Sequence, residues 1–366
     1  MTKNIVMAVT LACAWAGVAA AGMDSEDAAK VSLGEPFWSS RKMEHEPVLF
    51  IQAKDTPVAS GRLLFTPSAQ PVIMDPAGKM KYEEGTDYVW KKGTDTIELT
   101  AQSRIPSKTM AQMFPATGGL GGRLFSEGHY FHDLQVQVTY EHAAAWTWQP
   151  PPTTNQLARA LAKLQGKREF KIVAIGDSIT EGYNASGFKK VWAPPYQPCY
   201  AQLVANTLQQ RFGVQVALVN LGVAGTRASQ GFTQVDKLKA AGPDLVMIAF
   251  GMNHGESGTA FEATTRQLLT AVQAAAPDAD IILVASMTQA PNKGKVADKF
   301  FAYRDALRRL ETPNVAVADV ATPFAELLKR KQFSDLSGNN YNHPNDFTHR
   351  LYAQVICQFF PSVNRN

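Results

Sequence analysis

The second half of the chain alternates strand-length apolar segments with helix-length segments, and this pattern constrains the fold more than any other feature. Strand candidates are 171–175, 214–220, 244–250, 280–285 and 314–318. Helical stretches lie around 198–211, 228–241, 259–276, 297–310 and 345–360. Apolar strands separated by helices are typical of a parallel sheet covered by helices on both faces. We therefore predict an α/β domain over residues 167–366.

The first half has a different pattern, that of short strands between about Trp38 and Trp148. The strand candidates, rich in β-branched or aromatic residues, are 47–51, 62–66, 95–100 and 133–140. Turn-rich stretches such as 75–78 and 118–122 separate them. We predict a small all-β sandwich, jelly-roll-like, over residues 36–150. Three prolines, 150–152, form the expected linker, and a helix over 155–165 is expected to lead into the second domain.

Residues 1–21 have the pattern of a secretory signal peptide. Lys3 is the positively charged start, residues 5–18 are apolar, and 19–21 are three alanines suited to cleavage. An uncleaved membrane anchor is the alternative, although the apolar run falls just short of the usual spanning length. We therefore expect a secreted or periplasmic protein without stable membrane insertion.

Composition is that of an ordinary globular protein, with 45% hydrophobic and 19% charged residues, and the length of 366 residues favours two domains. The formal net charge of +4 falls to +3 once residues 1–21, which contain Lys3 and no acidic residue, are removed. Because no basic run accompanies this small excess, a nucleic-acid partner is not expected. The oligomeric state stays open.

Cysteine and histidine spacings do not resemble a metal site, so we expect neither a metal nor another cofactor. After removal of residues 1–21, Cys199 and Cys357 remain, and the sequence leaves open whether they pair or are separately buried thiols. The histidines of the first half, interpreted as loop or sandwich residues, are His45, His129, His132 and His142.

A serine stands at the exit of the first strand of the α/β domain, in the segment 176–180, Gly-Asp-Ser-Ile-Thr. Ligands gather beyond the carboxyl ends of such strands, which is where Ser178 is expected. His343 precedes the last helical stretch. A serine hydroxyl becomes a good nucleophile when an imidazole takes its proton, so we interpret the two as nucleophile and base. The alternative for this segment is an ordinary turn or helix cap.

Three further segments also stand at the ends of predicted elements. They are 220–225 after the second strand of this half, 250–255 after the third, and 343–346 before the final helix. With 176–180, they resemble the four blocks of the SGNH hydrolase superfamily, also called GDSL-type esterases, over residues 168–360. The resemblance implies a flavodoxin-like three-layer α/β/α fold. It also implies Ser178 as nucleophile, His343 as general base, and an oxyanion hole made by the amide of Ser178, Gly225 and Asn253.

The chain departs from the family at the third catalytic residue. Where the family usually has Asp three residues before the histidine, this chain has Asn340. An amide cannot stabilise an imidazolium with a full charge. Asp335 and Asp346 are the nearby candidates for the acid. Because Asp346 is better placed to cap the last helix, we favour a Ser-His dyad in which a backbone carbonyl orients His343.

Other residues near the blocks have weaker assignments. His254 occupies the place of the Asp that usually follows the oxyanion Asn, and it either lines the pocket or belongs to the loop structure. Trp192 and Tyr196 follow the nucleophile and could form an aromatic wall for a sugar ring, or simply pack in the loop. His349 is interpreted as a structural histidine and Asp177 as a brace of the nucleophile turn.

We predict an exported, metal-independent carboxylester hydrolase that forms an acyl-serine intermediate and removes acetyl groups from a carbohydrate or polysaccharide. The carbohydrate substrate is implied by the resemblance, because secreted members with an attached β-sandwich are similar to carbohydrate deacetylases. Alternatives within enzymes are a lipase or thioesterase for longer acyl chains and a sugar O-acetyltransferase. The alternative from another class is a non-catalytic carbohydrate-binding protein with a decayed site.

Overall fold

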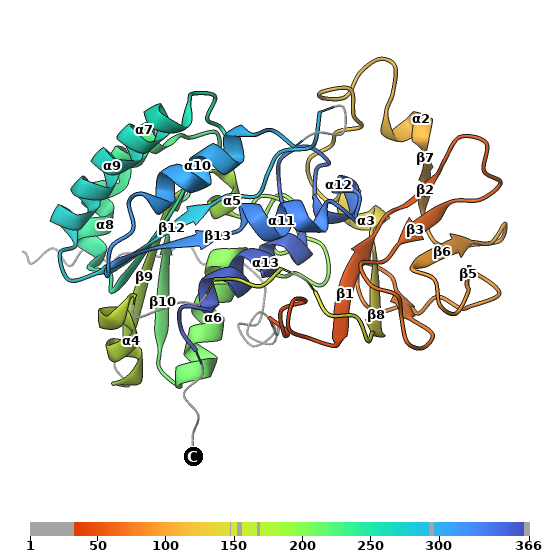
Figure 1. Ribbon diagram of the computed structural model, residues 1–366, viewed down its shortest axis with the longest axis horizontal. Helices are drawn as coiled ribbons and strands as arrows, with labels where there is room; N and C mark the ends of the chain where they lie inside the picture. Colours follow the sequence, from red (N-terminus) through yellow and green to blue (C-terminus); the bar gives the residue numbers. More distant parts are fainter. Residues whose placement is uncertain (1–32, 147, 152–155, 167–168, 293–295, 362–366) are drawn as a thin grey trace, which may run out of the picture.

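The computed structural model describes residues 33–146, 148–151, 156–166, 169–292 and 296–361 (Figure 1), so the predicted signal peptide, residues 1–21, lies outside the described residues. The N-terminal part contains β1 (Lys42–Val48), β2 (Phe50–Gln52), β3 (Ser60–Arg62), β4 (Val72–Met74), β5 (Tyr88–Trp90), β6 (Thr96–Leu99), β7 (Ser107–Thr109), α2 (Met110–Met113), α3 (Tyr130–Leu134) and β8 (Val136–Glu141). The strands of the C-terminal part are β9 (Phe170–Gly176), β10 (Val216–Asn220), β11 (Leu245–Ala249), β12 (Asp280–Ala285) and β13 (Val315–Asp319). Its helices are α4 (Ala158–Gln165), α5 (Ser178–Glu181), α6 (Tyr200–Phe212), α7 (Ala228–Gly231), the 3-10 turn η1 (Phe232–Gln234), α8 (Val235–Ala241), α9 (Gly258–Ala275), α10 (Lys299–Arg308), α11 (Ala321–Leu327), α12 (Phe333–Leu336) and α13 (Asp346–Cys357).

The N-terminal part is a β module, as predicted, built as two sheets of order β1-β8-β4 and β5-β6-β3-β2-β7. The predicted strand 62–66 was misplaced, because it overlaps β3 only at Arg62. Its strand pairs are antiparallel except for β2 and β7, which run parallel. The predicted strand 133–140 begins only at Val136, because residues 130–134 form α3. This short helix follows a segment of the module that extends toward the other half of the molecule (Figure 1).

The C-terminal part is the predicted α/β domain, with a parallel sheet of order β10-β9-β11-β12-β13. In chain order this is 2-1-3-4-5, the flavodoxin-like arrangement. The predicted strands agree with the observed ones to within two residues. The predicted helix 228–241 is divided into α7, η1 and α8, and the sequence analysis did not predict the short helices α5, α11 and α12.

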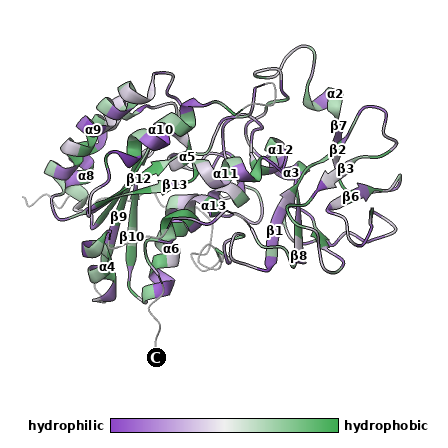
Figure 2. Ribbon diagram, in the orientation of Figure 1, coloured by the Kyte–Doolittle hydropathy of each residue, from purple (hydrophilic) through white to green (hydrophobic). Residues whose placement is uncertain are grey.

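Alternate residues of β9 show how the sheet is buried from both sides. Ile172 and Ala174 belong to the core that includes α6 and α13, whereas Val173 and Ile175 belong to the core formed with α8, α9 and α10. Figure 2 shows central strands that are largely hydrophobic and covering helices that carry both colours. Such burial on both faces explains the continuous apolar strands in the sequence.

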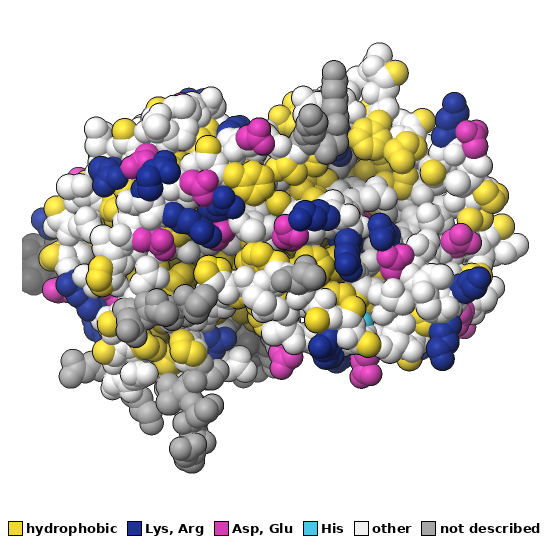
Figure 3. All heavy atoms as spheres, viewed as in Figure 1, with side chains coloured by type: hydrophobic (Ala, Val, Ile, Leu, Met, Phe, Trp, Pro, Cys, Tyr) yellow, Lys and Arg dark blue, Asp and Glu magenta, His cyan; other side chains and the backbone are white. Residues whose placement is uncertain are grey.

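The two parts share a hydrophobic core rather than meeting only through a linker. The cluster that fills the β module, including Phe65 and Val138, continues through Phe37 and Phe347 to α6 and α13. Among the described residues, no helix combines the length and apolar character needed to cross a bilayer. On the face drawn in Figure 3, positive and negative side chains are interspersed.

Candidate active site

The topology brings the predicted blocks to one edge of the sheet. Ser178 follows β9, Gly225 follows β10 and Asn253 follows β11, and these three strands are neighbours in the order β10-β9-β11. Because the strands are parallel, their carboxyl ends lie at the same edge. β10 lies on one side of β9 and β11 on the other, so the strand order changes direction at β9. Ligands of such folds bind at this point, beyond the carboxyl ends of β9 and β11.

The nucleophile stands in a tight turn between β9 and α5. A Cβ on Gly176 would lie 2.2 Å from Thr180 Oγ1 and 2.5 Å from the Ala249 carbonyl oxygen, so a glycine is required there. Asp177 is the N-cap of α5, and its Oδ1 accepts the N–H of Ile179 at 3.0 Å. Burial raises the pKa of Asp177 to about 6. Asp177 thus braces the turn that presents Ser178.

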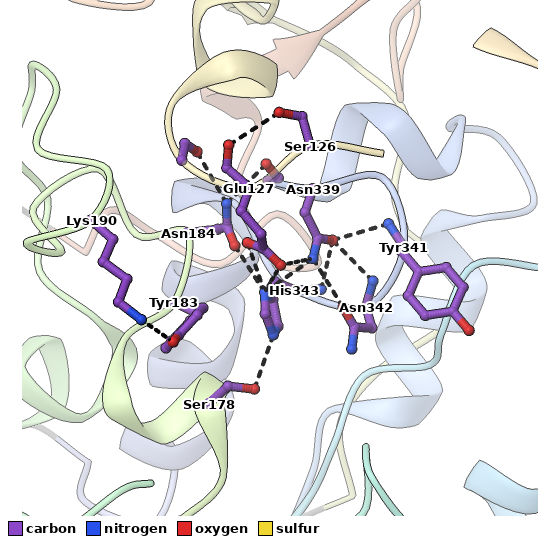
Figure 4. A network of polar contacts seen from close by, with 12 residues as sticks. Ser126, Glu127, Ser178, Tyr183, Asn184, Lys190, Asn339, Tyr341, Asn342 and His343 are labelled. Carbon is purple, nitrogen blue, oxygen red and sulfur yellow. Dashed lines mark hydrogen bonds and ion pairs between the residues drawn. The ribbon is translucent and has the colours of Figure 1, made fainter. Parts of the chain in front are cut away.

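Ser178 and His343 meet although 165 positions separate them in the chain. Ser178 Oγ lies 2.9 Å from His343 Nε2. The two residues are only 3% and 6% exposed, respectively, so the pair is largely shielded from water. Figure 4 shows Ser178 on one side of the imidazole and a group of polar side chains on the other.

The other ring nitrogen faces a buried amide, Asn184. Its Nδ2 donates to the carbonyl oxygens of Gly128 at 3.2 Å and Gly338 at 3.0 Å, which fixes the orientation of the amide. Its Oδ1 therefore points to His343 Nδ1, at 2.9 Å. Since an amide oxygen only accepts, Nδ1 carries the ring proton and Nε2 is left free to accept from the Ser178 hydroxyl. This is the tautomer that a general base needs.

A second amide, Asn339, shapes the loop that carries His343. Its Oδ1 accepts the backbone N–H groups of Tyr341, Asn342 and His343, each at 3.0 Å. Its Nδ2 donates to Glu127 Oε1 at 3.0 Å and Asn342 Oδ1 at 2.9 Å. The same Nδ2 lies 3.0 Å from His343 Nδ1, but both its hydrogens are directed elsewhere. Asn339 thus supports the loop, and His343 Nδ1 donates its proton to Asn184 Oδ1.

The acid nearest to His343 comes from the N-terminal part of the chain. Both carboxylate oxygens of Glu127 approach Nδ1, at 3.3 and 3.4 Å. Its side chain is 41% exposed, which distinguishes it from the buried Asn184. Sequence reasoning missed both residues. The signal for Glu127 was indirect, since the Asn at position 340 meant that an acid either came from elsewhere or was absent.

Asn340, at the usual position of the acid, does not contact the catalytic histidine. Its Nδ2 donates to the Leu124 carbonyl oxygen at 2.9 Å, and its backbone is left-handed, with a φ of 60°. The preference for a dyad oriented by a backbone carbonyl was wrong, because side chains occupy the Nδ1 side of His343.

The two aspartates considered from the sequence are engaged elsewhere. Asp335 is buried, and its Oδ1 accepts the N–H of Leu49 at 2.8 Å. Asp346 Oδ1 accepts the N–H of Ser186 at 2.7 Å. Neither carboxylate is a partner of the imidazole. The expectation that Asp346 caps the last helix was wrong, because the N-cap of α13 is Asn345.

The predicted oxyanion donors lie on loops attached to the nucleophile turn. Gly225 has a φ of 77° and open space where a Cβ would stand, so its backbone is accessible. Its loop is held by Glu181, whose Oε2 accepts the N–H of Ala224 at 2.8 Å. Asn253 Nδ2 donates to the Thr226 carbonyl oxygen at 3.0 Å, which joins the loops after β10 and β11.

His254 is not available to a substrate, contrary to its assignment as a binding residue. It is 2% exposed, its Nε2 accepts the N–H of Ala228 at 3.0 Å, and its Nδ1 contacts Glu256. With both ring nitrogens engaged, His254 supports the loop that carries Asn253. Of the two interpretations made from the sequence, the one in which His254 belongs to the loop structure is correct.

His349 is fully buried, as a structural histidine. Its Nδ1 accepts the N–H of Tyr200 at 3.3 Å and its Nε2 donates to the Tyr183 carbonyl oxygen at 3.1 Å. Burial lowers the pKa of His349 to about 4, so its ring is neutral at pH 7.

The segment after α5 carries aromatic side chains, of which Tyr183 lies beside the catalytic histidine. The Tyr183 ring lies 5.0 Å from the His343 ring, between centroids, and Lys190 Nζ donates to the Tyr183 hydroxyl. Farther along, Trp192 is 47% exposed, and its ring lies 5.0 Å from that of the partly buried Tyr196. The structure thus leaves Trp192 and Tyr196 accessible, and their role with a sugar stays a prediction.

Metal-binding groups and disulfides are absent from the part of the chain that the structure describes. It contains no cluster of three or more His, Cys, Asp or Glu side chains suited to a metal ion. Cys199 and Cys357 are free thiols, the first partly and the second fully buried.

Comparison with known families identifies the α/β part. Residues 174–351 match the GDSL-like Lipase/Acylhydrolase family. The chain carries a GDSL-like lipase/acylhydrolase domain. This domain, a carboxylic ester hydrolase domain, contains Ser178, Gly225, Asn253 and His343, whereas Glu127 lies outside the matched residues.

Solved structures with a similar fold include an esterase active on acetylated mannans and an acetylxylan esterase. A two-domain esterase active on acetylated mannans, crystallised with mannopentaose, is 23% identical, with a TM-score of 0.45. The match covers 56% of this chain and 53% of that one, so the chain spans about half the length of this esterase. An acetylxylan esterase from Geobacillus stearothermophilus is 22% identical over 54% of this chain and 97% of its own, with a TM-score of 0.44. No curated protein sequence matches the chain.

Proposed function

We propose that the protein is an exported serine carboxylester hydrolase that works through an acyl-serine intermediate and removes acetyl groups from a carbohydrate. The observation that carries the catalytic part is the 2.9 Å approach of Ser178 Oγ to His343 Nε2, with Asn184 holding the proton on the opposite nitrogen. This arrangement gives the serine a base in the correct tautomer.

The proposed reaction has two steps, acylation of Ser178 and deacylation by water. Ser178 Oγ attacks the ester carbonyl carbon while its proton passes to Nε2, and the oxyanion is held by N–H donors around Gly225 and Asn253. The imidazolium then protonates the departing alcohol as the bond from carbon to the alcohol oxygen breaks. Water then attacks the acyl-serine carbonyl carbon and gives one proton to Nε2, which passes it to Ser178 Oγ as the bond from carbon to Oγ breaks and the carboxylic acid leaves.

Two features support a small acyl group on a carbohydrate alcohol. Ser178 and His343 are almost completely buried, so little room is open at the reacting atoms, which favours acetyl over long chains. The exposed Trp192 and its neighbour Tyr196 stand on the segment whose Tyr183 packs against His343. Aromatic faces of this kind offer an apolar surface to a sugar ring.

Hydrolysis of p-nitrophenyl acetate by full-length variants tests the catalytic part. We expect Ser178→Ala and His343→Ala each to lower kcat by about 10⁴-fold or more, because either change removes the activated nucleophile. The exposed Ser229→Ala is the matched control and should retain the rate. Near-normal turnover by Ser178→Ala or His343→Ala would remove the assignment.

The substrate is tested separately by comparing acetyl, butyryl and octanoyl esters and by measuring acetate release from acetylated oligosaccharides. An acetyl preference, with a raised KM for the oligosaccharide but not for p-nitrophenyl acetate in Trp192→Ala, is the expected result. A preference for octanoyl esters would point instead to a lipase or thioesterase. Export rests on residues 1–21 alone and is tested by fractionating cells that produce the full chain.

A further inference from the structure

The segment that ends at Glu127 belongs to the N-terminal β module but packs on the loops of the active site. Arg123 Nη2 donates to the Pro291 carbonyl oxygen at 3.1 Å, and the rings of Phe125 and Tyr341 meet edge to face at 6.3 Å between centroids. The Leu124 carbonyl oxygen accepts from Asn340 Nδ2 at 2.9 Å. The contacts with Tyr341 and Asn340 hold the segment against the loop that carries the catalytic histidine.

The same segment also contacts the second loop of the site. The Gly128 carbonyl oxygen accepts from Asn184 Nδ2, so the residue after Glu127 helps to orient the amide that faces His343. Glu127 itself accepts from Asn339 Nδ2 at 3.0 Å, which leaves its two oxygens close to His343 Nδ1. Figure 4 shows Glu127, Asn184 and Asn339 grouped on the side of the ring opposite Ser178.

We propose that Glu127 is the positioning residue that supplies the negative charge for the His343 imidazolium, so that the β module completes the active site of the α/β domain. The inference rests on the proposed serine hydrolase mechanism, in which His343 becomes positively charged as it takes the serine proton. Glu127 acts through His343 and does not touch the substrate.

Two residues share the work that one aspartate performs in a Ser-His-Asp triad. Asn184 is buried and 2.9 Å from Nδ1, so it fixes the tautomer, but as an amide it carries no charge. Glu127 is farther away, at 3.3 Å, and more exposed, so it is a weaker hydrogen-bond partner but brings a full charge. Partial burial raises the pKa of Glu127, but the contact with His343, together with Asn339 and Lys190, outweighs this and lowers it. Glu127 is therefore ionised at neutral pH.

Several other groups face the histidine or its immediate neighbours. They are Lys190 and Tyr183 after α5, Asp177 in the nucleophile turn, and His349 on α13. Asp177 is buried beneath the nucleophile and Lys190 is exposed and bonded to the Tyr183 hydroxyl. None of these groups places a carboxylate at Nδ1, whereas Glu127 has both its oxygens there.

The experiment is the pH profile of kcat/KM for p-nitrophenyl acetate in the full-length Glu127→Gln variant. The side chains have the same shape, and the glutamine oxygen can still accept from Asn339. We expect kcat to fall about 10- to 100-fold, less than the roughly 10⁴-fold loss on neutralising a triad aspartate, because Asn184 still fixes the tautomer. The acidic limb of the profile should move to lower pH by about 0.5 to 1 unit, since the imidazolium loses a nearby negative charge. KM should change little.

Controls separate this role from a structural one. Asp133→Asn removes an exposed carboxylate from α3 that contacts His129, and it should leave both rate and profile unchanged. Glu127→Asp keeps the charge and should recover part of the loss. A wild-type rate in Glu127→Gln, or a lower rate without movement of the acidic limb, would overturn the inference. Ser178→Ala is measured beside it, because an active serine variant overturns the proposed function itself, whatever Glu127 does.

Discussion

The two sides of the His343 ring are built by different parts of the molecule. On the Nε2 side, Ser178 and the oxyanion loops come from consecutive strand ends of one parallel sheet. On the Nδ1 side, the partners come from three separate segments, including one in the β module. The first side is set by the topology of the α/β fold. The second depends on how the loops of two regions pack together, and it is where this chain departs from the usual GDSL-type pattern.

The largest effect expected on the Nδ1 side follows from removing the orienting amide. Asn184 has a φ of 62°, which glycine adopts without strain, so Asn184→Gly removes the amide with little backbone cost. We expect kcat to fall about 10³-fold at nearly constant KM, because the ring loses the acceptor that selects its tautomer. Steady-state kinetics together with a thermal unfolding curve measures this. Unchanged kcat in the folded variant would mean that the two sides of the ring are not coupled as described.

The matching test on the other side is Asn253→Ala. Loss of one oxyanion donor should lower kcat by about 10²- to 10³-fold without altering the acidic limb of the pH profile. This distinguishes it from Glu127→Gln, for which the limb moves. If Asn253→Ala shifted the limb or left kcat intact, Asn253 would not be an oxyanion donor.

Low pH should destabilise the packing around Asn184 through His349. The His349 ring donates to the carbonyl oxygen of Tyr183, the residue before Asn184. The pKa of His349 is about 4 in the folded protein against an ordinary 6.5, so the unfolded chain binds the proton first as pH falls. The contribution of His349 to the free energy of unfolding is therefore complete above pH 6.5 and declines by about 3 kcal/mol toward pH 4. Urea unfolding at several pH values measures this slope. His349→Gln should flatten it and the exposed His129→Asn should not; an equal slope in His349→Gln would contradict the assignment.

The smallest effect on activity is expected at the position where the family places its acid. Asn340→Asp should not raise kcat, because that side chain is directed to the Leu124 carbonyl oxygen and not to His343. It should instead lower the free energy of unfolding by about 1 to 3 kcal/mol, since a buried donor is replaced by an acceptor. Kinetics and urea unfolding of this variant check both statements. A gain in kcat would show that the family position still reaches the ring.

Much of the fold and half of the site could be predicted from the sequence, for a physical reason. Strands buried on both faces give continuous apolar runs, and the residues at their carboxyl ends must converge, so Ser178 and Asn253 could be placed together. Glu127 and Asn184 could not, because their meeting at His343 depends on loop packing across the two regions. The same limit applies to His254, whose burial between the loops after β10 and β11 leaves no mark on the sequence.

The most direct test of the account is ¹⁵N NMR of the histidine side chains in the full-length protein above pH 7, with His343 assigned by comparison with His343→Ala. The account predicts that the proton of neutral His343 is on Nδ1, held by Asn184, and that Nε2 is unprotonated and faces Ser178. A signal showing the proton on Nε2 would contradict it, because the imidazole could not then take the proton of the serine.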